Sequence, residues 1–421
     1  MKKTTFIIFT VLIMALVAGG IYWFFYMRAP AETDPSTEPT TGRTGFWPFA
    51  RNPSPQVVDT FPSVSTTTPF PDTQEVSEVE LPQLRKISST PVGGMGVISL
   101  EGFSILRFID RGTGHVSETH NLTLENETIS NTTLPKIYES YWNKNLNAFI
   151  LRFTRGDTDT IANLFAELRP IASTTEAQTS TRFEVKGKYI SDTIDQITVS
   201  PAGDKVATWN IEDAKGALYV STFDEKTRTK LLDAPFTQAT LEWPEINTLL
   251  LGTKASAGSS GYLYKVDIKT GVQTKLLGGI KGLSGTMSRD AQHVLFSRGG
   301  IDSVNTSLLT VKDSVVSEVI FKTLADKCTW STLRKNEIYC AVPTEIPQGI
   351  YPDAWYKGTV SFVDQIWHLN TATGEVHLLA NLLRLSDELI DATKLTLDPD
   401  ENFLYFTNKR DLSLWSLDLN K

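Results

Sequence analysis

The sequence contains two cysteines, Cys328 and Cys340, and their spacing suits a disulfide bond. They flank a short segment around Arg334 that is typical of a β-hairpin, and antiparallel pairing about that residue sets 328 opposite 340 and Trp330 opposite Ile338. Directly opposed Cα atoms lie about 4.5–5.5 Å apart, within disulfide range. The alternative is a pair of buried thiols, and a location outside the cytoplasm favours the disulfide.

A second group of residues has side chains suited to binding. The segment 343–363 is rich in large aromatic residues, and aromatic side chains on a loop carried by a rigid scaffold are good anchors for a partner. The alternative interpretation is that the segment folds onto the domain as a plug. The predicted ligand-binding residues are Tyr351, Asp353, Trp355, Tyr356 and Phe362.

Catalytic chemistry finds little support in the motifs. The sequence lacks the G-x-S-x-G, H-E-x-x-H and G-x-x-x-x-G-K-[ST] patterns, and its five histidines are scattered along the chain. Two cysteines and five histidines leave little for a Cys/His metal site. We therefore expect no catalytic residues, no metal and no cofactor.

The N-terminus carries a membrane signal. Residues 4–27 contain no charged side chain, and this run of 24 residues exceeds the roughly 20 that span a bilayer. Lys2 and Lys3 precede the run, and aromatic residues mark its far end, as at a membrane interface. The sequence predicts a single-pass signal anchor over residues 1–28, with the N-terminus in the cytoplasm and the rest outside. A cleaved signal peptide is the alternative, but its apolar region is usually shorter.

A linker follows the predicted anchor. Residues 30–80 hold nine Pro, ten Thr and five Ser, a composition that cannot bury enough apolar surface to offset the entropy of ordering. We expect residues 29–80 to be a disordered tether between the membrane and a folded domain.

From residue 81 onward, short β-branched and aromatic runs alternate with Gly, Asp, Asn and Pro turns. The first core residue of each second strand recurs at 43 to 45 residues in four of six intervals, and the other two intervals are longer, as if by insertion. A four-stranded propeller blade runs about 40–45 residues. The seven recurring residues are Leu106, Phe149, Val206, Leu249, Val294, Ile338 and Leu404.

The ends of the repeat region predict how the ring closes. The last repeat stops after its third strand, two residues before the C-terminus, whereas residues 81–88 have the pattern of a fourth strand. Pairing the two removes both open sheet edges. The fold class is therefore all-β, a seven-bladed β-propeller of four-stranded blades over residues 81–421.

One turn of the repeat resembles a known family. Residues 200–209, SPAGDKVATW, are similar to the S-P-D-G-K-apolar signature of TolB-like propellers, which are WD-repeat-like, and residues 398–400 and 288–290 carry weaker versions. Residue 202 is Ala where the family has Asp. The resemblance covers roughly residues 81–420 and implies a membrane-anchored bacterial propeller of a class whose members often bind proteins or envelope components.

These observations predict a non-catalytic, membrane-tethered extracytoplasmic propeller that binds or scaffolds a protein or an envelope glycan. The alternative is a hydrolase or lyase whose site lies in the central funnel, because propellers host such chemistry too. A funnel lined by Ser, Thr and apolar groups would favour binding, and converging carboxylates or histidines would favour the enzyme. The net charge of −8 and the lack of a basic stripe argue against a nucleic-acid partner.

Overall fold

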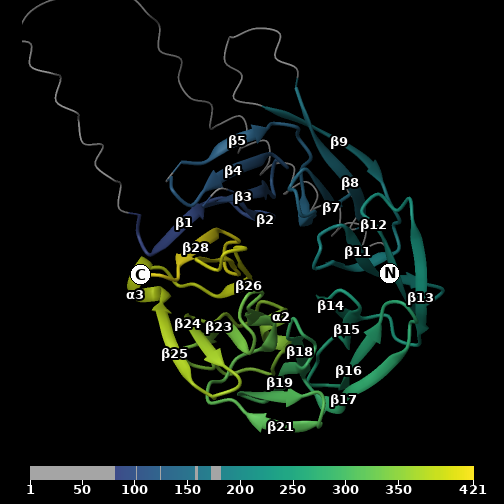
Figure 1. Cartoon of the computed structure of the whole chain (residues 1–421), viewed down its shortest axis with the longest axis vertical. Coiled ribbons are helices and arrows are strands. Elements are labelled where there is room, and N and C mark those ends of the chain that lie inside the picture. Colours follow the sequence, from purple (N-terminus) through teal and green to yellow (C-terminus); the bar gives the residue numbers. More distant parts are fainter. Residues whose placement is uncertain (1–80, 101, 124, 157–159, 172–181) are drawn as a thin grey trace, which may run out of the picture. The chain divides into compact units, whose positions relative to one another are not determined.

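The computed structural model describes residues 81–100, 102–123, 125–156, 160–171 and 182–421. These residues form seven four-stranded antiparallel sheets, arranged as the blades of a propeller around a central axis (Figure 1). The predicted seven-bladed fold is confirmed. The predicted anchor and linker, residues 1–80, lie outside the described residues, and within the described part no helix is long and apolar enough to cross a membrane.

The first three blades follow one another along the chain. Blade one comprises β2 (Val92–Leu100), β3 (Phe103–Asp110), β4 (Val116–His120) and β5 (Glu127–Ser130). Blade two comprises β6 (Ile137–Trp142), β7 (Ala148–Thr154), β8 (Ile161–Pro170) and β9 (Phe183–Tyr189). Blade three comprises β10 (Ile194–Val199), β11 (Lys205–Glu212), β12 (Lys215–Thr222) and β13 (Arg228–Ala234).

The next three blades repeat this order. Blade four comprises β14 (Ala239–Glu245), β15 (Thr248–Thr253), β16 (Ser260–Asp267) and β17 (Gln273–Lys281). Blade five comprises β18 (Leu283–Met287), β19 (His293–Gly300), β20 (Ser303–Thr310) and β21 (Val315–Glu318). Blade six comprises β22 (Cys328–Trp330), β23 (Glu337–Pro343), β24 (Asp364–Asn370) and β25 (Val376–Asn381), with the short helices η1 (Ala325–Lys327), α2 (Asp353–Tyr356) and α3 (Leu382–Ser386) in the connections around it.

Blade seven is built from both ends of the described chain. It contains β26 (Ala392–Leu397), β27 (Phe403–Asn408) and β28 (Leu414–Asp418), and its outer strand is β1 (Leu84–Ser88). Strand β1 pairs antiparallel with β28, with Leu84 opposite Leu417. The predicted closure by an N-terminal strand is therefore confirmed.

The core lies between adjacent blades rather than in one central mass. Each of the seven recurring residues of the sequence repeat lies on the second strand of its blade and is buried, with at most 1% of its surface exposed. Separate hydrophobic clusters join neighbouring blades, such as Leu106 with Tyr405 of blade seven and Trp209 with Trp243 of blade four. Because each blade buries the same position of its second strand, the seven core residues recur at nearly constant intervals in most of the sequence.

Antiparallel order also assigns the turns to two faces. The turn between the first and second strands of a blade lies at one end of the strands, and the connection between the second and third strands lies at the opposite end. The first turns of all seven blades therefore gather on one face. The 343–363 insertion connects β23 with β24, so it belongs to the other face.

Candidate functional site

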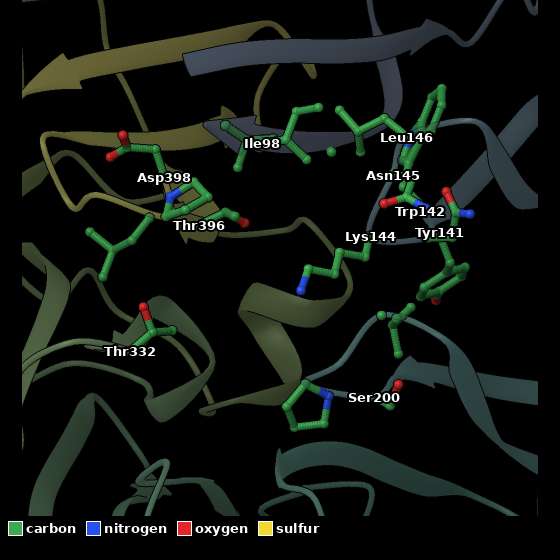
Figure 2. A pocket seen from close by; sticks show the side chains of 18 of the residues that line it. Ile98, Tyr141, Trp142, Lys144, Asn145, Leu146, Ser200, Thr332, Thr396 and Asp398 are labelled. Atoms are coloured by element: carbon green, nitrogen blue, oxygen red, sulfur yellow. The ribbon is translucent and has the colours of Figure 1, made fainter. Parts of the chain in front are cut away.

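The described propeller has a central funnel on the face of the first turns (Figure 2). Its volume is about 990 Å³, and all seven blades contribute to its lining. The wall includes Ile98 on β2, Tyr141 on β6 and Thr396 on β26. The funnel therefore forms only when the blades are arranged in a ring, because each blade lines only part of its wall.

The lining of the funnel is mainly aliphatic and hydroxylic. Leu100 and Ile246 are 46% and 62% exposed, while the aromatic Trp142 is buried. Ser200, Thr332 and other hydroxyl-bearing residues lie between these apolar groups. No histidine contributes to this lining, and the described residues contain no group of three or more His, Cys, Asp or Glu able to hold a metal ion.

The charged groups of the funnel differ in how far they are already paired. The carboxylate of Asp398 is buried and accepts hydrogen bonds from Ser104 Oγ and the Phe403 amide, both at 2.7 Å. Glu245 accepts from the amide of Asn247 at 3.0 Å. The side chains of Lys144 and Arg289, in contrast, are exposed and make no hydrogen bond or ion pair with any described residue.

Lys144 has the most central position of the labelled side chains, because its ammonium group extends from the blade-two turn toward the middle of the funnel (Figure 2). The turn of blade three holds its backbone: the Lys144 amide donates to Gly203 O at 3.0 Å. Gly203 has a φ of +67°, and a Cβ there would approach the Lys144 backbone N to 2.7 Å. The glycine of the family-like turn is therefore required by this contact.

The first turns of blades six and seven are joined by Glu401. This buried carboxylate accepts hydrogen bonds from Ser331 Oγ at 2.8 Å, the Thr332 amide at 2.5 Å and the Leu333 amide at 3.0 Å. Burial raises the pKa of Glu401, but these donors outweigh burial and leave the pKa below its usual value. Glu401 thereby fixes part of the funnel rim.

The predicted binding segment on the opposite face is folded inward. Tyr351, Trp355 and Phe362 are 0%, 5% and 1% exposed, and they pack with Val304 and Leu324 of the neighbouring connections. Of the two interpretations of residues 343–363, the structure shows the plug. These three side chains therefore offer no exposed contact area, because they are used as core.

Polar contacts tie this plug to blades four and five. Asp353, on α2, accepts from Ser256 Oγ at 2.8 Å and from the Ala257 amide at 2.7 Å. Burial raises the pKa of Asp353, but the two hydrogen bonds outweigh it and leave the pKa below the usual value. Ile350 forms a β-bridge with Ile301 of blade five. Asp353 is therefore a structural contact of the plug, although sequence placed it among the binding residues.

The remaining aromatic residue is also held by a carboxylate. The hydroxyl of Tyr356 donates to Asp326 Oδ1 at 3.0 Å, and burial raises the pKa of Tyr356 well above its usual value. The hydroxyl therefore stays neutral across the physiological range. Together with the contacts of Asp353, this places all five predicted residues in the packing between the plug and blades four to seven.

A buried ionic cluster lies beneath the plug. Lys327, Asp364 and Asp391 are each 0% exposed. The Lys327 ammonium is 2.8 Å from Asp364 Oδ2 and forms a still closer ion pair with Asp391 Oδ1. Burial raises the pKa of Asp364 to about 6; Lys327 opposes this rise, and the negative charge of Asp391 adds to it.

This cluster was missed at the sequence level. Its members lie at residues 327, 364 and 391, with no motif spacing between them. One signal was present: each charged residue immediately precedes or begins an apolar strand, where a surface charge is not expected. That signal alone does not say that the three strands meet.

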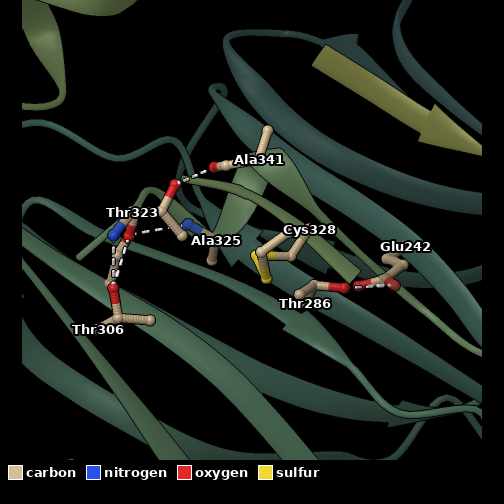
Figure 3. The surroundings of a disulfide bond; sticks show 9 residues. Glu242, Thr286, Thr306, Thr323, Ala325, Cys328 and Ala341 are labelled. Atoms are coloured by element: carbon tan, nitrogen blue, oxygen red, sulfur yellow. Dashed lines mark hydrogen bonds between the residues drawn. A yellow bond between two sulfur atoms is a disulfide. The ribbon is translucent and has the colours of Figure 1, made fainter. Parts of the chain in front are cut away.

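The two cysteines form a disulfide at the start of the same blade. Cys328 forms a disulfide with Cys340 (Figure 3). The two residues lie opposite each other in the ladder of β22 and β23, with Trp330 opposite Ile338. The pairing predicted from sequence is confirmed. The disulfide crosslinks strands β22 and β23 next to Lys327, and the two cysteines are 12 residues apart in the sequence.

Comparison with known proteins identifies the fold. No family model matches the chain, and no curated protein matches its sequence. An oligogalacturonate lyase in complex with manganese is 9% identical, with a TM-score of 0.52 over 81% of this chain and 95% of that chain. The oligogalacturonate lyase from Vibrio parahaemolyticus is 9% identical, with a TM-score of 0.51 over 80% of this chain and 93% of that chain.

A peptidase propeller is a more distant match. The β-propeller domain of the Trilobed protease from Pyrococcus furiosus is 12% identical, with a TM-score of 0.43 over 65% of this chain and 78% of that chain. At these identities the likeness shows the propeller fold alone. The chain is thus a seven-bladed propeller whose fold resembles that of the two lyases at a distance.

Proposed function

We propose that this chain is a non-catalytic binding or scaffold propeller whose ligand, a protein or an envelope glycan, contacts the central funnel. One observation carries the proposal. The funnel combines exposed aliphatic side chains and hydroxyls with two cations that make no hydrogen bond or ion pair to a described residue. Its carboxylates accept hydrogen bonds from Ser104, Phe403 and Asn247. Concave sites with apolar walls and few polar groups of defined position are typical ligand sites. The funnel replaces the 343–363 segment as the proposed contact surface, because Tyr351, Trp355 and Phe362 of that segment are buried.

We further propose that residues 4–27 tether the propeller to the cell membrane, with the N-terminus in the cytoplasm and the propeller outside. The uncharged run and the preceding lysines support this orientation. External protease added to intact cells should then degrade the propeller, and carbonate washing should leave the intact chain in the membrane. Protection from the protease would contradict the orientation.

The experiment for binding is capture from envelope extract with the detergent-solubilised full chain. We expect the double variant Lys144→Glu plus Ile246→Glu to lower capture by about tenfold or more, as for central residues of an interface. The matched control is Lys269→Glu plus Val315→Glu, which makes the same chemical changes at exposed positions outside the funnel lining. Equal capture by both variants would contradict binding at the funnel.

The alternative is lyase or hydrolase chemistry in the funnel. The fold resemblance to two oligogalacturonate lyases motivates a direct assay with oligogalacturonate and manganese. Formation of an unsaturated product would favour this alternative. The proposal of a non-catalytic role has more support, because the funnel lining lacks histidine and its two carboxylates already serve turn geometry.

A further inference from the structure

The buried cluster beneath the plug brings an amine and two carboxyl groups into direct contact. Lys327 ends η1, Asp364 begins β24, and Asp391 immediately precedes β26. All three side chains are withdrawn from solvent. A lysine and a carboxylate held together without water are the two reactants of an amide bond, and enforced proximity can supply a large part of the barrier to such a reaction.

Asp391 is held as an acyl donor would be. Its Oδ1 faces the Lys327 ammonium, while its Oδ2 accepts hydrogen bonds from Trp355 Nε1 at 2.9 Å, the Phe362 amide at 2.9 Å and Ser361 Oγ at 3.1 Å. Three donors on one carboxyl oxygen stabilise negative charge that develops there when a nucleophile adds to Cγ. Trp355 Nε1 also lies 3.2 Å from Oδ1, so Oδ1 faces the amine and one shared donor, whereas Oδ2 accepts from three donors.

Asp364 is placed to relay protons. Its Oδ2 lies 2.8 Å from Lys327 Nζ and accepts from the Ala392 amide, whereas its Oδ1 is buried without a hydrogen-bond partner. Burial raises the pKa of Asp364 to about 6, so a neutral acid is accessible near neutral pH. A neutral carboxyl group can donate one proton while its other oxygen accepts another.

Aromatic side chains complete the site. The Lys327 ammonium lies 5.2 Å from the ring centroids of both Trp355 and Phe362. These rings come from the plug, and they cover the cluster. Exclusion of water removes the solvent that would solvate the ammonium and hydrolyse an activated carboxyl group.

We propose that Lys327 Nζ and Asp391 Cγ join in an intramolecular amide bond. Lys327 first transfers a proton to Asp391 Oδ1, which leaves a neutral amine and a neutral carboxyl group. The amine lone pair then attacks Cγ, and the charge that develops on Oδ2 is held by the Trp355, Ser361 and Phe362 donors. Asp364 accepts a proton from the nitrogen and donates its own to the departing Oδ1, so that the C–Oδ1 bond breaks and one water leaves.

The proton balance of the step is complete. An ammonium and a carboxylate become an amide and one water, and Asp364 is a neutral acid before and after. No oxidant, reductant or cofactor is consumed. The product bond joins the chain before β22 in blade six to the chain before β26 in blade seven, directly beneath the plug.

Tryptic digestion of the purified full chain, after reduction and denaturation, tests the proposal. Lys327, Asp364 and Asp391 fall on separate stretches between tryptic sites, residues 323–334, 358–384 and 385–394. We expect 323–334 without cleavage after Lys327, joined to 385–394, at the summed mass less one water. Cleavage after Lys327 with free 385–394 would overturn the proposal, and linkage to 358–384 would overturn the assignment of Asp391.

Variants separate the roles. Asp391→Ala should restore cleavage after Lys327. Asp364→Asn keeps both reacting groups, and its rate of bond formation should fall about a hundredfold, as for loss of a general acid–base group. The matched control Asp353→Asn removes another plug carboxylate, which does not contact Lys327, and should retain the bond. An undiminished bond in Asp364→Asn would overturn the relay role. If a variant does not fold, the wild-type digest still decides whether the bond forms.

Discussion

At the scale of single residues, the buried cluster holds more negative than positive charge. Before the proposed amide bond forms, two carboxylates face one ammonium, and all three side chains are fully buried. Removing an ionised carboxylate from water costs several kcal/mol unless a partner compensates it. Lys327 and three hydrogen-bond donors compensate the buried negative charge of Asp391. Burial of Asp364 is compensated less, and its pKa rises to about 6.

This shift predicts how stability depends on pH. The folded-state pKa of Asp364 lies above its unfolded value of 3.8, so the stabilisation by its proton is complete below pH 3.8 and is lost as the pH rises through 6. In protein whose digest shows no bond between Lys327 and Asp391, the wild type should therefore lose roughly 2 kcal/mol of unfolding free energy, relative to Asp364→Asn, between pH 4 and pH 7. Urea unfolding at both pH values measures the difference. The exposed Asp400→Asn serves as control, and parallel pH profiles for wild type and Asp364→Asn would contradict the prediction.

At the scale of elements, the insertion of blade six acts as a structural plug. Its aromatic side chains pack on one another, with Tyr351 and Phe362 ring centroids 5.7 Å apart and Trp355 and Phe362 centroids 6.2 Å apart. Its polar contacts reach four blades. The aromatic content that suggested a binding loop is thus explained by packing. The Trp355 and Phe362 rings lie over the buried Lys327 ammonium.

The plug predicts a clear contrast between two substitutions. Trp355→Ala should lower the unfolding free energy by about 4 kcal/mol, because it leaves a large cavity and removes the Nε1 donor to Asp391. Ile350→Ala, at a side chain that is 55% exposed on the same segment, should cost less than about 1 kcal/mol. Thermal denaturation of the two variants checks this. Similar melting temperatures would mean that the plug is not part of the cooperative fold.

The turn that joins blades six and seven predicts a second element-scale effect. Glu401→Ala leaves the Thr332 and Leu333 amides without their acceptor, so the unfolding free energy should fall by about 2–3 kcal/mol. The neighbouring exposed Asp400→Ala provides the matched control and should change little. Equal losses in both variants would show that the Glu401 contacts add no net stability.

At the scale of the whole molecule, the ring depends on a strand from the beginning of the described chain. Strand β1 contributes the buried Leu84 and Ile87 and pairs with β28. The Gln83 side chain, just before β1, donates a hydrogen bond to the Lys421 carbonyl oxygen. Without β1, blade seven would expose the edge of β28, and blades six and one would lose part of their contact with it.

Removal of this strand is therefore predicted to weaken the whole ring. A chain that begins at residue 92 should have an unfolding free energy about 3–6 kcal/mol below that of a chain that begins at residue 78, from the lost burial of Leu84 and Ile87 alone. Circular dichroism melting of the two chains provides the measurement. Coincident melting curves would contradict closure by β1.

The propeller architecture could be predicted from the sequence, because each blade repeats one local pattern. Each blade buries the same position of its second strand, so the seven core residues from Leu106 to Leu404 could be found by their interval. The Cys328–Cys340 disulfide was also predictable, since a hairpin fixes which residues oppose each other within a few positions. Closure of the ring was predictable because the last repeat has three strands and residues 81–88 have the pattern of a fourth.

The burial of the 343–363 insertion and the meeting of the three charged residues could be seen only in the folded chain. The fold buries Trp355 and Tyr351, because aromatic residues suit a core and a contact surface equally well and only their neighbours distinguish the two. Lys327, Asp364 and Asp391 meet because three connections from two blades converge under the plug. Such contacts depend on how blades six and seven pack against each other, and no local period in the chain encodes them.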